Sequence, residues 1–279
     1  AMEAQRVRLL ISVANVEEAQ AALEGGADIV DAKDPFAGAL GAVSPITLRG
    51  IVGAVGGARP VSVALGDVSD ERAVELAARR AASERVAYVK IGFAGVDDEA
   101  LVERLIAAAA DGASMVSSAV GVIAVAYADY ERVGTVSPLD VVVAAERAGA
   151  MGVLLDTAVK HAGNLFAMWR ATDVATWVRG AHDAALTAAV AGSLGSRDLA
   201  AVRVIGADVA GVRGAACEGG RLGRVTRDRV AALALSAGQR VWPGEEIAQR
   251  RAAAREGGAF RPGFDRNGDG ELRPSAVLP

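Results

Sequence analysis

The chain has 279 residues, of which 52% are hydrophobic, 23% charged and only 4% aromatic. This composition is typical of a globular protein with a core of Ala, Val, Leu and Ile, and it excludes a disordered chain. The formal net charge of −4 and a pI near 5.4 provide no basic surface for a phosphate backbone, so we expect no nucleic-acid partner.

Apolar runs and cysteine content bear on location and on metal binding. No run reaches about 18 uninterrupted apolar residues, and the N-terminus lacks the regions of a signal peptide, so we expect no membrane association. The single cysteine, Cys217, fits a reducing cytoplasm and excludes a cysteine-rich zinc site. The only histidines are His161 and His182, which excludes a three-histidine site. We therefore expect a cytoplasmic protein with no metal and no cofactor.

Short β-branched, apolar runs alternate with Ala-, Glu- and Arg-rich stretches of helical period. This alternation predicts βα units around a parallel sheet. An open doubly wound sheet is the alternative architecture, but no G-x-G-x-x-G turn follows the first strand. We favour an α/β fold of the (β/α)8 TIM barrel type over residues 6–238. The strands are expected at residues 8–13, 28–33, 61–66, 86–92, 122–128, 152–157, 187–192 and 208–214.

The character of the chain changes after the predicted barrel. Residues 239–279 are expected to form a C-terminal extension that is partly irregular. Residues 265–270, with the sequence DRNGDG, resemble the opening of a calcium-binding EF-hand loop. The twelfth loop position is Ala276 instead of Glu, and Pro274 interrupts the loop, so we expect a turn cluster and no calcium site.

Several charged residues come at or just after the ends of predicted strands. Inward residues alternate along barrel strands, and active sites gather at the C-terminal ends of those strands. We therefore expect three lysines and several aspartates around one mouth: Asp31 and Lys33 on the second strand, Lys90 on the fourth, Asp129 after the fifth, and Asp156 and Lys160 at and after the sixth.

The lysines suggest covalent chemistry, because a buried charge is costly without a partner or a ligand. Lysine is otherwise scarce, since most of the 30 basic residues are arginine. A lysine that is crowded by cations and shielded from water has a lowered pKa and can form an iminium with a carbonyl compound. A second amine or carboxylate could then move protons at the adjacent carbon. The alternative is that the Lys33–Asp31 and Lys160–Asp156 pairs are structural salt bridges.

Two glycine-containing segments follow the seventh and eighth strands, where barrels often bind phosphate through backbone N–H groups and a helix N-terminus. Glycine permits close approach of the backbone, and an arginine would add charge. The alternative interpretation is two tight βα turns. The residues expected to bind the substrate or its phosphate are Gly192, Ser193, Gly211, Arg213 and Gly214, together with Asp129.

The chain resembles the (5-formylfuran-3-yl)methyl phosphate synthases, also called 4-(hydroxymethyl)-2-furancarboxaldehyde-phosphate synthases, of methanofuran biosynthesis. The resemblance covers about residues 8–235 and consists of several separated motifs in order. These are ADIVDAKDP at 27–35 with GALGA at 38–42, YVKIG at 88–92, AYAD at 126–129, LDTAVK at 155–160, AGSL at 191–194 and GVRGA at 211–215.

The resemblance implies a barrel enzyme that joins two molecules of glyceraldehyde 3-phosphate, with loss of phosphate and water, into a furan phosphate. By the family's pattern, Lys33 would form the Schiff base and Lys90 would accept a proton. Asp31, Asp156 and Lys160 would assist proton transfer and orient the substrate.

Other functions remain open at this point. A class I aldolase or another triose-phosphate barrel enzyme would share the lysine and the phosphate site, and a catalytically inactive barrel could serve as a binding protein. The expected partner is a small phosphorylated aldehyde, and we expect a homo-oligomer because barrels with Ala-rich outer helices often associate.

Overall fold

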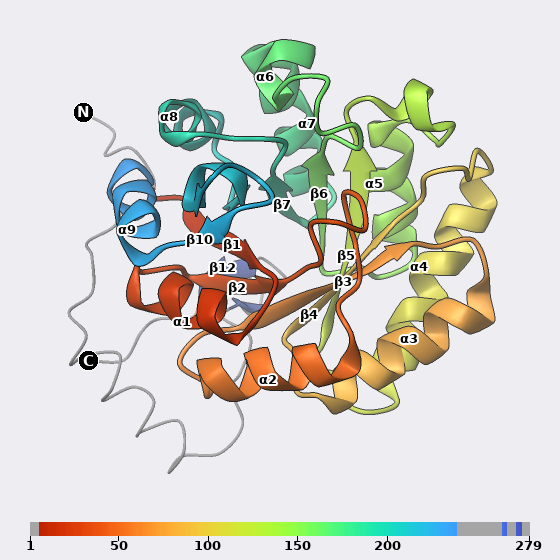
Figure 1. Ribbon diagram of the computed structural model, residues 1–279. Coiled ribbons are helices and arrows are strands. Elements are labelled where there is room, and N and C mark those ends of the chain that lie inside the picture. Colours follow the sequence, from red (N-terminus) through yellow and green to blue (C-terminus); the bar gives the residue numbers. More distant parts are fainter. Residues whose placement is uncertain (1–5, 239–263, 267–271, 275–279) are drawn as a thin grey trace.

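Eight parallel strands form a closed barrel in sequential order, from β1 to β8 (Figure 1). The computed structural model describes residues 6–238, 264–266 and 272–274. The closed ring confirms the predicted (β/α)8 barrel and excludes the open sheet. Each strand lies within two residues of its predicted bounds: β1 Arg8–Val13, β2 Ile29–Ala32, β3 Val61–Asp67, β4 Tyr88–Gly92, β5 Gly121–Tyr127, β6 Gly152–Asp156, β7 Thr187–Val190 and β8 Val209–Val212.

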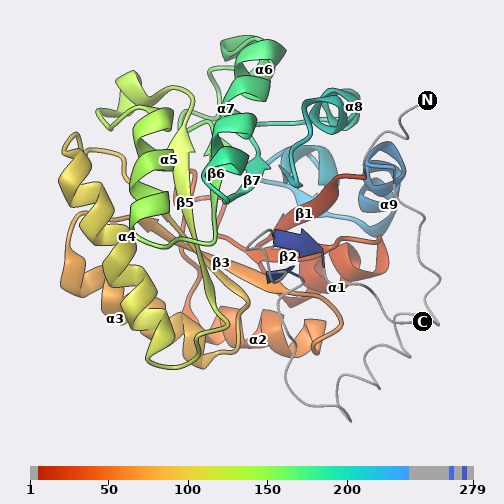
Figure 2. The same ribbon diagram turned by 180° about the vertical axis from the view of Figure 1, so that it is seen from behind.

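Helices alternate with the strands and cover the outside of the barrel (Figure 2). A short antiparallel pair, β9 (Cys217–Glu218) and β10 (Arg224–Val225), follows β8. Two 3₁₀ helices span Tyr130–Val133 and Gly214–Ala216. The α-helices are α1 Val16–Glu24, α2 Pro45–Val55, α3 Glu71–Ser83, α4 Glu99–Ser114, α5 Pro138–Arg147, α6 Leu165–Met168, α7 Ala171–Asp183, α8 Ser196–Ile205 and α9 Arg227–Ser236.

Local sequence fixes where several of these helices begin. The Asn15 side chain accepts a hydrogen bond from the backbone N–H of Glu18 (2.9 Å) and caps α1. In α5, the hydroxyl of Ser137 caps the helix and Pro138 occupies the first turn, where its missing N–H costs nothing. These caps hold the helices at defined distances after the preceding strands, which limits the length of the loops at the barrel mouth.

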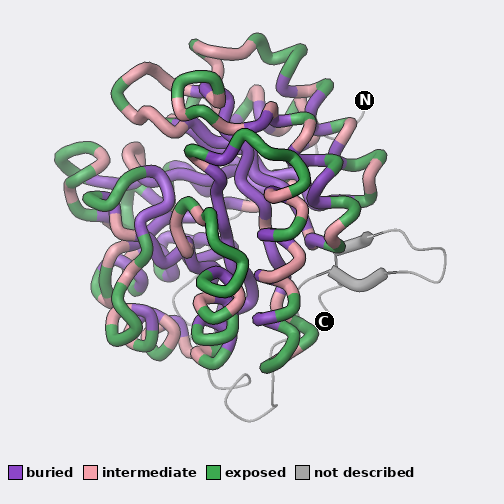
Figure 3. The backbone as a smooth tube through the Cα atoms, turned by 90° about the vertical axis from the view of Figure 1, so that its right-hand side faces the viewer, coloured by how far each residue is buried: buried purple, intermediate pink, exposed green. Residues whose placement is uncertain are grey.

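Alternation along each strand divides the core into two layers, and most residues of the barrel strands are buried (Figure 3). On β1, Leu9 and Ile11 pack against the surrounding helices, whereas Leu10 points into the barrel. On β2, Val30 likewise packs outward and Ile29 inward. The inward parity of β2 therefore includes residues 31 and 33, which brings polar side chains into the barrel interior.

Most of the predicted extension falls outside the described residues. Two short strands within it, β11 (Phe264–Arg266) and β12 (Leu272–Pro274), pair in antiparallel fashion. The centre of the calcium-like motif, residues 267–270, lies outside the described residues. Within the described part of the chain, the helices are too short or too polar to cross a bilayer.

Helices α3 and α4 pack so closely that a glycine is required between them. A Cβ on Gly112 of α4 would lie 2.1 Å from the carbonyl oxygen of Glu75 in α3. Gly112→Ala should therefore destabilise the fold by roughly 1–3 kcal/mol, because the helices must move apart. Gly53 in α2 has no neighbouring heavy atom within 4 Å of such a Cβ. Gly53→Ala should stabilise the fold by about 0.5–1 kcal/mol through helix propensity.

Urea unfolding of the two variants beside the wild type measures both effects. A Gly112→Ala protein as stable as the Gly53→Ala protein would contradict this packing.

Candidate active site

A cavity of about 250 Å³ opens at the C-terminal ends of the strands and reaches into the barrel. Lys33, Lys90 and Lys160 all line it, and they are the only three lysines of the 279-residue chain. Asp156 also lines it, and Asp31 is fully buried against Lys90. The structure thus brings together five of the six charged residues that the sequence predicts around one mouth, and the sixth, Asp129, does not line the cavity.

Asp31 is held by hydrogen bonds from both neighbouring strands. In the barrel register it lies opposite Ser12 of β1 and Ser62 of β3. The two hydroxyls donate to its carboxylate, at 2.8 Å from Ser12 and 2.7 Å from Ser62. The Lys90 Nζ lies 2.7 Å from the same carboxylate. These contacts satisfy a buried charge that would otherwise be costly, so the Asp31–Lys90 pair is fixed in one geometry.

A second ion pair forms at the end of β6. The Lys160 Nζ lies 2.5 Å from Asp156 Oδ1. Burial raises the pKa of Asp156, but Lys160 and Lys33 lower it more, so the net shift is downward and the carboxylate remains ionised. Asp129 contributes indirectly, because its carboxylate accepts hydrogen bonds from the backbone N–H groups of Ala158 (2.7 Å) and Val159 (2.9 Å). Asp129 therefore shapes the loop that carries Lys160.

Lys33 differs from the other two lysines. Among the described residues, no carboxylate lies within ion-pair distance of its amine, since Asp31 and Asp156 hold Lys90 and Lys160. Burial and the positive charge of Lys90 lower the pKa of Lys33 from 10.5 to about 7, and Lys160 contributes in the same direction. Near neutral pH a large fraction of Lys33 is therefore the free amine, which is the nucleophilic form.

Four of the residues expected to bind phosphate lie beside the cavity, in β8 and in the loops after β7 and β8. Gly192, Ser193, Gly211 and Gly214 line it, and α8 begins close by at Ser196. Gly192 has φ +109°, and a Cβ there would lie 2.9 Å from Thr157 Cγ2, so the close approach of the two loops requires glycine. Ser193 adopts φ +53°, a strained value for a residue with a side chain. Such strain is common at ligand-binding loops.

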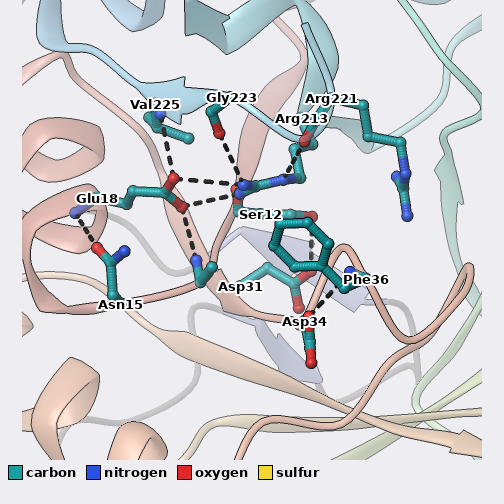
Figure 4. A network of polar contacts seen from close by, with 11 residues as sticks. Ser12, Asn15, Glu18, Asp31, Asp34, Phe36, Arg213, Arg221, Gly223 and Val225 are labelled. Atoms are coloured by element: carbon teal, nitrogen blue, oxygen red, sulfur yellow. Dashed lines mark hydrogen bonds and ion pairs between the residues drawn. The ribbon is translucent and has the colours of Figure 1, made fainter. Parts of the chain in front are cut away.

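Arg213 lies beside the cavity, but its guanidinium faces protein acceptors (Figure 4). It forms a buried ion pair with Glu18 at 2.8 Å. Its five N–H groups are matched by five contacts, two to the Glu18 carboxylate and three to the backbone carbonyls of Ser12, Gly223 and Arg221. No donor remains for a substrate. Arg213 instead fixes the segment between β9 and β10 over the mouth.

Sequence reasoning missed three polar residues of the site. Ser12 and Ser62 lie inside predicted strands, where a single serine is easily taken for a small core residue. Their inward parity, opposite Asp31, was the available signal. Arg221 lines the cavity from the segment between β9 and β10. Nothing in the sequence distinguishes it from the other arginines.

The remaining candidates lie away from this chemistry. His182 hydrogen-bonds Asp208 at 2.9 Å and His161 is exposed, and neither lines the cavity. Cys217 is buried, as expected for a small core residue. The part of the chain that the structure describes contains no group of three His, Cys, Asp or Glu side chains arranged to hold a metal.

The titration of Lys33 should respond to its neighbour. Competitive acetylation followed by peptide mass mapping should show Lys33 half-titrated near pH 7. Lys90→Met removes the cation that lowers the pKa of Lys33 most and leaves the Asp31 carboxylate without its lysine partner, so both changes should raise the pKa of Lys33 and move its labelling to higher pH. An unchanged midpoint in Lys90→Met would contradict the electrostatic origin of the shift.

The two lysines should also affect stability in opposite directions. Because the pKa of Lys33 is lower in the folded chain, its charged form destabilises the fold fully below about pH 7 and less as pH rises toward 10.5. Lys33→Met should raise the free energy of unfolding, on the order of a few kcal/mol at pH 6 and less at pH 9. Lys90→Met leaves a buried carboxylate without its lysine partner and should lower the free energy of unfolding by about 3–5 kcal/mol. Urea unfolding at both pH values measures this contrast, and destabilisation by Lys33→Met would refute it.

Solved structures with similar folds are other barrel enzymes. A phosphoribosyl anthranilate isomerase from Thermotoga maritima superposes with a TM-score of 0.56 at 18% identity, over 83% of this chain and 98% of that one. The protein described as KGPDC from Streptococcus mutans has a TM-score of 0.60 at 14% identity, over 86% of this chain and all of that one. At these identities the likeness supports the barrel fold alone.

Sequence relatives are much closer. The family model described as 4-HFC-P synthase matches residues 9–234. The (5-formylfuran-3-yl)methyl phosphate synthase of Methanosarcina barkeri is 37% identical over 228 residues, covering 81% of this chain and 97% of that protein. The synthase of Methanothermobacter thermautotrophicus is 40% identical over 232 residues, covering 81% and 96%. The barrel with its three-lysine cavity therefore belongs to the (5-formylfuran-3-yl)methyl phosphate synthase family.

Proposed function

We propose that this chain condenses two molecules of glyceraldehyde 3-phosphate into (5-formylfuran-3-yl)methyl phosphate through a Schiff base on Lys33. The observation that carries the proposal is the unpaired amine of Lys33, whose pKa is lowered to about 7 inside a cavity large enough for a small sugar phosphate. The two trioses contain the atoms of the furan phosphate plus one phosphate and two waters. The sum is redox-neutral, so it requires no oxidant.

The first step joins Lys33 to the substrate. Its Nζ lone pair attacks the aldehyde carbon, the carbonyl oxygen leaves as water, and a positively charged iminium remains. Lys90, held at 2.7 Å from Asp31, is the proton donor for the departing oxygen. Once it has given up that proton, the neutral Lys90 amine can accept the proton on the carbon beside the iminium. The result is an enamine on Lys33.

The enamine then provides electrons for the remaining bond changes. Its electron pair adds to the carbonyl carbon of the second triose, which forms the new carbon–carbon bond, or expels the phosphate from the carbon next to it. The Asp156–Lys160 pair, at 2.5 Å, is placed to transfer protons to the oxygens that leave as water. Below the lysines, the cavity is lined by apolar side chains that suit the carbon skeleton and exclude water: Leu10, Ile29, Ile123 and Leu154.

The phosphate groups require a polar part of the cavity rim. Gly192, Ser193 and Gly214 bring backbone close to the cavity, and α8 begins beside them. Barrels commonly bind phosphate at this position, after the seventh and eighth strands. This placement would hold the phosphate at one side of the cavity and direct the aldehyde toward Lys33.

Incubation of the pure protein with glyceraldehyde 3-phosphate tests the proposal. We expect a furan chromophore and one inorganic phosphate released per furan formed. Borohydride added during turnover should trap the substrate on Lys33, and peptide mapping is simple because the chain has three lysines. Lys33→Arg keeps the charge but lacks a nucleophilic amine, so product and adduct should both fall to background.

The other outcomes identify other functions. A hexose bisphosphate in place of the furan would indicate an aldolase, and the absence of any trapped adduct would indicate a binding protein. Furan formation by Lys33→Arg at the wild-type rate would eliminate the Schiff base. Arg224→Gln, an exposed substitution outside the cavity, serves as the control and should leave turnover unchanged.

A further inference from the structure

The cations at the mouth of the cavity, formed by the C-terminal ends of the strands and the loops after them, divide into those with a carboxylate partner and those without. Lys90 is paired with Asp31, Lys160 with Asp156, and Arg213 with Glu18. Lys33 has no such partner, but its lowered pKa makes it largely neutral above pH 7. The mouth therefore needs another positive group if a phosphate dianion is to bind there, because backbone N–H groups contribute only partial charge.

Arg221 meets this need. It lines the cavity, is half-buried, and forms no ion pair with any carboxylate among residues 6–238. Its side-chain contact is with a neutral acceptor, the carbonyl of Gly38 in the loop after β2, at 2.9 Å. Burial lowers the pKa of Arg221, Asp156 opposes this effect and Arg213 adds to it, so the net shift is downward. A half-buried cation without an ion-pair partner can be stabilised by an anionic ligand.

The backbone of Arg221 is held in a fixed position over the mouth. The Arg213 Nε donates to the carbonyl of Arg221 at 2.9 Å, and its Nη2 donates to the carbonyl of Gly223 at 3.2 Å (Figure 4). The backbone of Arg221 also lies directly beside the expected phosphate loop, since a Cβ on Gly214 would be 3.8 Å from the backbone nitrogen of Arg221. The guanidinium thus lines the cavity from a segment whose backbone is anchored beside Gly214, and it reaches the carbonyl of Gly38 in the loop after β2.

We infer that Arg221 is the charged ligand of the substrate's phosphate monoester and determines the preference for phosphorylated aldehydes. The inference rests on the proposed function for the identity of the substrate. The inference does not depend on the Schiff base, because the phosphate would bind at the part of the cavity rim that is lined by Gly192–Gly195 and Gly214. A guanidinium suits this role, since its planar N–H groups can make two parallel hydrogen bonds to phosphate oxygens.

Glycerol 3-phosphate separates phosphate binding from chemistry, because it carries the phosphate on a three-carbon skeleton but has no carbonyl to form an imine. Arg221→Gln keeps an N–H donor for the Gly38 carbonyl and loses the charge. Calorimetric titration should show about tenfold to a hundredfold weaker binding of glycerol 3-phosphate by this variant. Arg221→Lys should fall between it and the wild type. The matched control, Arg224→Gln, removes the same charge from an exposed site of the neighbouring β10 and should bind within about twofold of the wild type.

A second measurement distinguishes recognition from damage to the site. Borohydride trapping of unphosphorylated glyceraldehyde on Lys33 should be the same in Arg221→Gln and the wild type, because that aldehyde has no phosphate for Arg221 to bind. Equal binding of glycerol 3-phosphate by Arg221→Gln and wild type would overturn the inference. So would an equal loss in Arg224→Gln, loss of glyceraldehyde trapping in Arg221→Gln, or no binding by the wild type. If the wild type binds glycerol 3-phosphate through Arg221 but forms no furan, the proposed reaction fails and the inference about Arg221 stands.

Discussion

The site depends on a difference in number, because in the described part of the chain three lysine amines share a cavity with only two carboxylates that pair with them. Three lysines project into the mouth of an apolar barrel, and Asp31 and Asp156 each hold one of them. The third, Lys33, has no carboxylate partner among the described residues. Burial and the positive charges of Lys90 and Lys160 make its protonated form costly. A reactive amine at neutral pH is therefore a property of the whole cluster. A third carboxylate within reach of Lys33 would raise its pKa again and remove the nucleophile.

Much of this arrangement could be predicted from the sequence because barrel geometry is regular. Strand parity puts Asp31 and Lys33 on the same inward face, and closure of eight strands brings Lys90, Asp156 and Lys160 to the same mouth. The partners within the cluster were harder to predict. Adjacent positions favoured a Lys33–Asp31 pair, whereas the structure pairs Asp31 with Lys90 across two strands. The choice depends on side-chain reach across the barrel, which sequence spacing does not encode.

The two arginines near the mouth show the same limit. Arg213 follows β8 within a glycine-containing segment, so its position predicted a phosphate ligand. Its partners are Glu18, nearly 200 residues earlier, and carbonyls of the following segment, and these contacts exist only in the closed fold. Arg221, in a segment without a recognisable motif, lines the cavity and forms no ion pair with a carboxylate of the described residues. Long-range neighbours, and not local sequence, decide which arginine is structural.

The Glu18 carboxylate also links the first strand of the barrel to the segments that follow the last strand. It accepts hydrogen bonds from the backbone N–H of Ala14 near β1, from that of Val225 in β10, and from Arg213 after β8. Together with the β1–β8 pairing, these contacts close the ring between segments that are about as far apart in sequence as the barrel allows. Contacts between such distant segments carry a large entropic cost of loop closure. During synthesis, the seam can form only after β8 and β10 have left the ribosome, so the cavity around Lys33 is completed by the last part of the barrel to be made.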